Sequence, residues 1–319
     1  MYAHEMFQVD FLNMLPEVQR QPEISSFHQD DADIGKDMFF FFAEEVLPLI
    51  KTNDWVYSAA KEFATKYSND YFLTIRMQSN VKEIQGKLTS LREEVKFFMN
   101  EVIRIGKAPN SIELTKLSDF MNVIEFQELP PDMQIKAKAL FETSSDLEKL
   151  YVNVGAQAIK VLYEKGFPRI FYVVKSALKK KMGLKKSSSD GTLLETHQYI
   201  DWCAQKLSSN HILSRAIVRQ RRFYKIVRNV DSHLSVPKWL PDTNEVFLPD
   251  KDDQITVTIT EFSKYYRYLM YFCEVGSRGI LAVFCDRERG SIANSIKNDY
   301  LKIFNNPELE SQIQDYPMQ

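Results

Sequence analysis

The chain has 319 residues, of which 44% are apolar, and its formal net charge at neutral pH is −2. This length and composition are sufficient for one large or two medium domains with their own hydrophobic cores. Because only 10 residues are glycine, turn-rich all-β folds and glycine-rich phosphate loops are disfavoured, and a mostly α-helical fold is expected.

The expected location is the cytoplasm. The first residues show no basic region followed by an apolar core, and no window approaches eighteen uninterrupted apolar residues. Secretion and membrane spanning are therefore not expected. The odd number of cysteines and the lack of a CxxC pair indicate a reducing compartment and disfavour a zinc site. These cysteines are Cys203, Cys273 and Cys285.

The sequence of the first half predicts an N-terminal helical region over residues 1–143. It contains no motif that indicates the function of this region. Residues 1–36 are expected to form an arm or short helices, and residues 37–74 two helices, the second starting at Asn53. From Asn80 to Ile105 apolar residues recur every three or four positions, which predicts one long amphipathic helix. It is either a core helix of a bundle or a coiled-coil partner helix.

Residues 106–135 contain four Gly or Pro residues and are the best candidate for a connection between domains. The second half is then a helical domain over residues 144–319. Its expected helices start at Ser144-Ser145, at Thr192 in a capping box with Glu195, and at Ser208-Ser209-Asn210.

The last of these helices should end near Arg228, because Pro237 and Pro241 prevent its continuation. The runs 245–248 and 255–259 predict a small β-hairpin. A final long helix is capped by Thr260, with Gly276 and Gly279 as candidate kink positions. The expected fold is thus a set of helical bundle domains with one small β-hairpin inserted before the last long helix of the C-terminal domain.

Charge is unevenly distributed along the chain. The segment Lys160 to Lys186 holds nine Lys or Arg residues and one acid, Glu164, whereas residues 30–45 are acidic. The stretch Lys206 to Arg228 holds no acid at all. Such clustering fits an anionic partner such as RNA, although basic helix faces also occur simply as solvated surface. The candidate RNA-binding residues are Arg215, Arg219, Arg221, Arg222 and Lys225.

Residues 228–233 read Arg-Asn-Val-Asp-Ser-His at the end of the basic helix. This arrangement resembles the Arg-polar-x-x-x-His motif of the HEPN superfamily, and the order of helix, motif, hairpin and closing helix resembles its abortive-infection and toxin-like members. The resemblance covers roughly residues 145–290. It implies a metal-independent endoribonuclease without a cofactor, with a role as a toxin or phage-defence effector. It also implies a homodimer with a composite active site and control by an antitoxin or regulatory protein.

The three candidate catalytic residues, Arg228, Asn229 and His233, suit RNA cleavage because RNA supplies its own nucleophile, the 2′-hydroxyl. An imidazole with a pKa near 6.5 can accept or return a proton at neutral pH. The guanidinium of Arg228 can stabilise the negative charge that develops on the phosphate. Asn229 could orient the phosphate or the imidazole by a hydrogen bond.

Other interpretations remain open. Arg at a helix C-terminus, Asn just after it and Asp-Ser in a turn are common structural features, so the motif could simply end a helix. The domain could instead be a non-catalytic helical module that binds a nucleotide, RNA or a protein. Ser235 stands where some family toxins carry a Tyr, so nucleotidylation of that position has no acceptor here. The other histidines have no spaced ligand set, and no metal site is expected.

Overall fold

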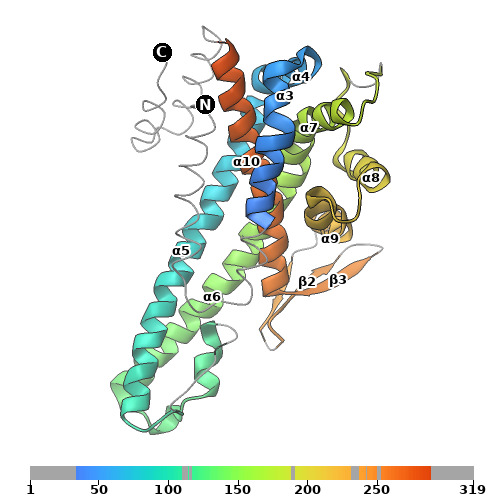
Figure 1. Ribbon diagram of the computed structural model, residues 1–319. Helices are drawn as coiled ribbons and strands as arrows, with labels where there is room; N and C mark the ends of the chain where they lie inside the picture. The colour runs from blue at the N-terminus through green and yellow to red at the C-terminus, as the bar shows by residue number, and fades with distance from the viewer. Residues whose placement is uncertain are drawn as a thin grey trace. The chain divides into compact units, whose positions relative to one another are not determined.

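The computed structural model describes residues 34–109, 114, 117–187, 191–230, 237–241, 243–249 and 253–288, without the side chains of residues 68–73, 75 and 230 (Figure 1). These residues are mostly helical, and their strands form a three-stranded antiparallel sheet just before the last long helix, α10 (Ile259–Glu288). The predicted fold class is therefore confirmed. The hairpin predicted at 245–259 is present and carries an additional edge strand.

The chain divides into two compact units, each made of separate stretches of sequence. Unit 1 comprises residues 1–76, 161–222 and 264–319, and unit 2 comprises residues 77–160 and 223–263. The division differs from the predicted boundary at 143/144, which lies inside the continuous helix α6 (Pro131–Val161). The chain passes from one unit to the other inside α5, α6, α9 and α10.

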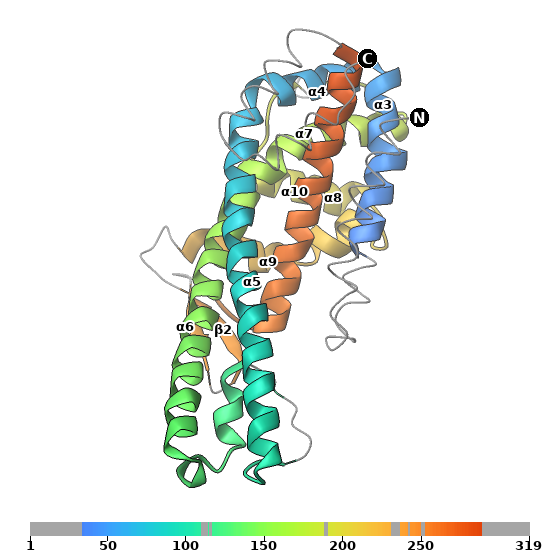
Figure 2. The same cartoon turned by 90° about the vertical axis from the view of Figure 1, so that its left-hand side faces the viewer.

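Unit 1 contains the helices predicted for residues 37–74. The π-helical turn η1 (Phe41–Val46) leads into α3 (Leu47–Thr52), and α4 (Asp54–Lys66) follows after Asn53, as predicted. Later stretches add η4 (Leu162–Gly166), α7 (Phe167–Lys181), α8 (Thr196–Lys206), η6 (Ser214–Val218) and most of α10. Figure 2 shows α3 and α4 joined by a sharp change of direction, which Asn53 makes with extended backbone.

Aromatic rings fill the core of unit 1. Phe167 and Phe171 of α7 stack with a centroid distance of 5.2 Å, and Phe272 of α10 lies 4.8 Å from Phe167 and 5.5 Å from Phe42. Gly276 lies one helical turn after Phe272, and a Cβ added there would come within 2.5 Å of Phe42 and 2.7 Å of Ile170. Instead of kinking α10, which continues unbroken to Glu288, Gly276 lets these two side chains approach its backbone.

Unit 2 is built on α5 (Ser68–Arg104) and α6, which lie side by side in both views (Figures 1 and 2). Two short 3₁₀ helices, η2 (Leu117–Asn122) and η3 (Phe126–Glu128), lie in the segment between them. The prediction that residues 106–135 connect two domains is wrong, because this segment contributes buried side chains to the cluster formed with α5 and α6. These are Leu117, Phe120, Ile124 and Leu129.

A buried carboxylate fastens this segment to α6. Oε1 of Glu148 accepts a hydrogen bond from the backbone N–H of Leu117 at 2.7 Å, and Oε2 accepts one from the hydroxyl of Ser118 at 3.2 Å. A buried donor that loses its acceptor costs on the order of 1–3 kcal/mol, and hydrogen bonds to charged groups are among the stronger ones. Glu148 therefore contributes to the stability of unit 2 even though it is an ionisable residue in the protein interior.

We expect Glu148→Ala to lower the free energy of unfolding by about 2 kcal/mol, because it leaves the Leu117 amide without its acceptor. Denaturant unfolding monitored by circular dichroism measures this loss. Glu142→Ala is the matched control, since Glu142 is exposed on the same helix and its replacement should change stability by less than about 0.5 kcal/mol. Equal stability of the two variants would show that the Glu148 bonds contribute no net stability.

Three helix starts differ from the predicted ones. Ser144 does not begin a helix, since α6 starts at Pro131 and the buried Ser144 hydroxyl donates to the Phe141 carbonyl at 3.0 Å. The capping box near residue 192 is formed three residues later, where the N–H of Glu195 donates to Oε1 of Gln198. Similarly, Thr258 rather than Thr260 precedes α10. Thr258 and Glu261 exchange two bonds, the N–H of each donating to the side chain of the other.

The small sheet belongs to unit 2 and has the order β1-β2-β3, with β1 (Lys238–Leu240), β2 (Glu245–Pro249) and β3 (Gln254–Thr258). Val246 and Leu248 of β2 are buried and alternate with less buried residues, as expected for a sheet with one covered face. Val246 pairs with Val257 of β3, which is also buried. The covered face is thus aliphatic, and β3 leads directly into α10.

Among the described helices, α10 is long and apolar enough to meet a length-and-composition criterion for crossing a membrane. Of its most apolar 18-residue window, 72% is buried inside the protein. Core helices meet the same criterion, so this is weak evidence for a membrane span.

Candidate functional site

The helix that carries the predicted motif, α9 (Arg221–Val230), is strongly amphipathic. Its apolar side chains Phe223, Tyr224, Ile226 and Val227 are all buried, whereas Arg221, Arg222 and Lys225 are exposed. The buried residues recur at helical spacing, so one face of α9 is apolar and the other basic. α9 begins with Arg221 and Arg222 in unit 1 and continues in unit 2.

Within unit 2, α9 packs on the beginning of α10 through Phe262. The ring of Phe223 meets that of Phe262 edge to face at 5.9 Å, and the ring of Tyr151 from α6 makes a second edge-to-face contact with Phe262 at 6.4 Å. Gly155 provides space on α6, since a Cβ there would lie 2.8 Å from the Phe262 ring. The hydroxyl groups of Tyr151 and Ser263 are 2.9 Å apart and share a hydrogen bond. These contacts fix α9 in its place in unit 2.

The two described motif residues lie in the last turn of α9. Arg228 and Asn229 are each half-buried, and the helix ends at Val230. His233, the third predicted catalytic residue, lies outside the described residues. The structure therefore places the guanidinium and the amide where the sequence predicts them, at the C-terminal end of a basic helix that is followed by the sheet and α10.

The five predicted RNA-binding residues do not form one uniform set. Arg219, Arg221, Arg222 and Lys225 are exposed, but Arg215 is half-buried and its Nη1 donates to Oδ2 of Asp37 at 2.8 Å. Arg219 donates from Nη2 to the Ser209 carbonyl at 3.0 Å. The helix predicted from Ser208 to Arg228 is also interrupted by the π-helical turn η6 and by a turn at 219–220. Of the predicted set, Arg221, Arg222 and Lys225 share α9 with the motif.

Among the residues that the structure describes, no group of three or more His, Cys, Asp or Glu side chains is placed to hold a metal ion. Cys203 and Cys273 are buried there, and burial raises the pKa of both thiols, which keeps them protonated. They are therefore unsuited to act as thiolate nucleophiles or metal ligands.

Of the described histidines, His211 makes the most contacts with neighbouring groups, and apart from its position before a helix no sequence pattern indicates this. Its Nδ1 accepts a hydrogen bond from the Leu213 N–H at 3.2 Å, and its ring meets the Phe41 ring edge to face at 5.4 Å. Burial lowers the pKa of His211; the Glu45 carboxylate opposes that shift and the Lys181 ammonium adds to it. His211 is thus a neutral packing residue at neutral pH.

This lowered pKa predicts a pH-dependent stability. The unfolded chain, in which the His211 pKa is near 6.5, binds the proton more readily than the folded one, so the free energy of unfolding should fall as the pH drops below about 6.5. We expect His211→Gln to lose less stability than wild type between pH 7.5 and pH 5, measured by urea unfolding. Identical losses in the two proteins would contradict the assignment.

No protein-family model, no curated protein and no solved structure matches this chain.

Proposed function

We propose that the protein is a metal-independent endoribonuclease of HEPN type, with Arg228, Asn229 and His233 as its catalytic residues. The observation that carries the proposal is the position of Arg228 and Asn229 in the last turn of a helix whose exposed face is basic. The sheet and α10 follow that helix in the order that the resemblance implies. Exposed Arg and Lys side chains on α9 suit the sequence-independent contacts that proteins make with RNA phosphates.

The proposed reaction is transesterification within the RNA. The 2′-oxygen attacks the adjacent phosphorus, the bond to the 5′-oxygen of the next nucleotide breaks, and the products carry a 2′,3′-cyclic phosphate and a 5′-hydroxyl. His233 accepts the proton of the 2′-hydroxyl or returns one to the leaving oxygen. Arg228 stabilises the additional negative charge on the phosphate oxygens, and Asn229 orients the phosphate or the imidazole.

One histidine cannot easily serve as acid and base in the same step, so the proposal includes a homodimer in which two motifs form a composite site. Cytoplasmic location, a role as a toxin or phage-defence effector, and control by an antitoxin or regulatory protein are parts of the same proposal. None of these requires a bound cofactor.

The test is to incubate the purified chain with labelled single-stranded RNA in the presence of EDTA. We expect cleavage without added metal, fragments that end in 2′,3′-cyclic phosphate, and no cleavage of an RNA whose 2′-hydroxyls are methylated. If no RNA is cleaved, or if cleavage requires a divalent ion, the proposal fails. Tight RNA binding without turnover would instead favour a non-catalytic RNA-binding module.

A further inference from the structure

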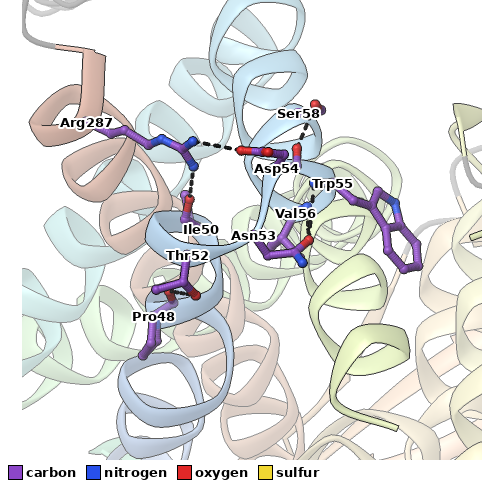
Figure 3. Close-up of polar contacts among 9 residues, drawn as sticks. All are labelled: Pro48, Ile50, Thr52, Asn53, Asp54, Trp55, Val56, Ser58 and Arg287. Carbon is purple, nitrogen blue, oxygen red and sulfur yellow. Dashed lines mark hydrogen bonds and ion pairs between the residues drawn. The ribbon is translucent and has the colours of Figure 1, made fainter. Parts of the chain in front are cut away.

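Unit 1 contains an open depression with a basic lining, in a part of the molecule that the proposed active site does not use. Its volume is about 540 Å³, which is within the range of small-ligand sites. One wall is the start of α4, drawn in Figure 3, and the other is the end of α7 with the residues after it. The lining residues are Thr52, Asn53, Asp54, Trp55, Lys180, Gly183, Leu184, Lys185 and Lys186.

A helix-ending turn forms the basic wall. At the end of α7 the N–H of Gly183 donates to the Lys180 carbonyl at 3.1 Å, and the N–H of Leu184 donates to the Lys179 carbonyl at 2.9 Å. These two bonds and the positive φ of Gly183, 69°, define a Schellman motif. The turn directs the chain so that Lys185 and Lys186 line the same depression as Lys180.

The wall formed by α4 is held by its own hydrogen bonds. Oδ1 of Asn53 accepts from the N–H groups of Trp55 and Val56, both at 3.2 Å, which satisfies the free amides at this helix end (Figure 3). Arg287 of α10 donates to the Ile50 carbonyl at 2.8 Å and to Oδ1 of Asp54 at 3.0 Å (Figure 3). The wall is therefore preorganised, and the negative charge of Asp54 is balanced by Arg287.

Positive charge dominates the lining. The lining contains three lysines, Lys180, Lys185 and Lys186, and one acid, Asp54. All three are exposed, and within the described ranges no ion pair involves them. The half-buried indole of Trp55 is part of the opposite wall. The ammonium of Lys179 lies 5.8 Å from the centroid of this ring. The depression thus combines exposed cations with an aromatic ring, the two features that bind the backbone and the bases of single-stranded nucleic acid.

We infer that this depression binds single-stranded RNA, with Lys180, Lys185 and Lys186 contacting phosphates and Trp55 stacking on an unpaired base. A duplex would present its phosphates but not a free base face, so the aromatic wall favours single strands. The inference takes RNA as the partner from the proposed function, and it deepens that function by naming the form of RNA and a second contact surface. It requires binding only, not cleavage.

The test uses the full chain carrying His233→Ala, so that the RNA stays intact, and a fluorescent 12-nucleotide RNA without secondary structure. In this background we expect the triple variant Lys180→Ala, Lys185→Ala, Lys186→Ala to bind at least 10-fold more weakly by fluorescence anisotropy. Loss of three phosphate contacts should also reduce the slope of log affinity against log salt by about 2. Circular dichroism melting establishes that the variant is folded.

Two further variants separate the aromatic contribution from the charge. Trp55→Ala should weaken RNA binding by about 5-fold to 100-fold without changing the salt slope, and Trp55→Phe should restore most of the affinity. The matched control for charge replaces the same number of exposed lysines elsewhere in the chain. It carries Lys61→Ala, Lys82→Ala and Lys138→Ala, all outside the two basic segments, and it should bind RNA within about 3-fold of the parent.

The inference is overturned if the triple variant binds RNA as tightly as the control variant, or if a duplex of the same sequence binds as well as the single strand. It is also overturned if the triple substitution abolishes binding to phosphatidylserine vesicles while RNA binding persists, which would indicate a membrane surface. Its failure is distinguishable from failure of the proposed function. RNA binding that depends on these lysines in a protein that never cleaves RNA would refute only the nuclease.

Discussion

Replacing His233 with Ala is expected to lower the rate of RNA cleavage by about 1,000-fold while leaving the protein folded. General acid–base catalysis contributes typically 10²–10⁴-fold to a rate, and Ala at this position can neither accept the 2′-hydroxyl proton nor supply one to the leaving oxygen. The measurement is the single-turnover cleavage rate of labelled RNA in EDTA. The same variant should bind RNA with nearly wild-type affinity, since in the proposed reaction the imidazole acts on the reacting protons rather than on the backbone.

Arg228→Ala should lower the same rate by about 100-fold to 1,000-fold, because the charge developing on the phosphate loses its cation. Arg228→Lys should recover part of it, since an ammonium keeps the charge but not the planar fork. The matched controls are His197→Ala, at an exposed position, and Arg104→Ala, which removes another arginine from the last turn of a helix. Full activity of Arg228→Ala or of His233→Ala would remove the basis of the nuclease proposal.

The second large effect concerns folding. We expect Gly276→Ala to lower the free energy of unfolding by about 3 kcal/mol, because its methyl group would meet Phe42 at 2.5 Å and Ile170 at 2.7 Å. Both neighbours are buried in the core of unit 1, so neither can move aside at low cost. Urea unfolding followed by circular dichroism measures the effect.

Gly86→Ala provides the control with the opposite sign. Gly86 lies inside α5, and nothing lies within 4 Å of a Cβ added there. Alanine at this position should stabilise the protein by about 0.5–1 kcal/mol, since it restricts the unfolded chain and favours the helix. Similar stabilities for the two alanine variants would show that the core around Gly276 accommodates the additional methyl group.

Much of the helical architecture follows from periodicity that can be read in the sequence. The run from Asn80 to Ile105 falls within α5, except for its last residue, and the amphipathic pattern before Arg228 corresponds to η6 and α9. The failures occur where spacing is irregular. Leu117 and Phe120 lie in a segment whose two 3₁₀ turns show no helical period, so the sequence indicates a connection there, yet these side chains fill the core of unit 2. Close approaches such as Phe42 to Gly276 depend on residues far apart in the chain.

The sites show the same limits. Local sequence was sufficient to predict that Arg228 and Asn229 end a basic helix, because helix signals act over a few residues. It could not predict that Arg215 forms a hydrogen bond with Asp37, which lies 178 residues earlier in the chain. Nor could it predict the lysine-lined depression. The cluster of positive charge up to Lys186 was visible, but its meeting with Trp55 depends on how α4 packs on α7.

The interleaved connectivity of the two units has a consequence for how this protein can be dissected. Because the chain crosses between them inside α5, α6, α9 and α10, each unit is assembled from stretches that are not contiguous in the sequence. A premature stop or a single protease cut near residue 160 would divide both units at once. Neither half of the gene therefore encodes an independent folding unit, and the roles of the two units are better separated by point substitutions than by fragments.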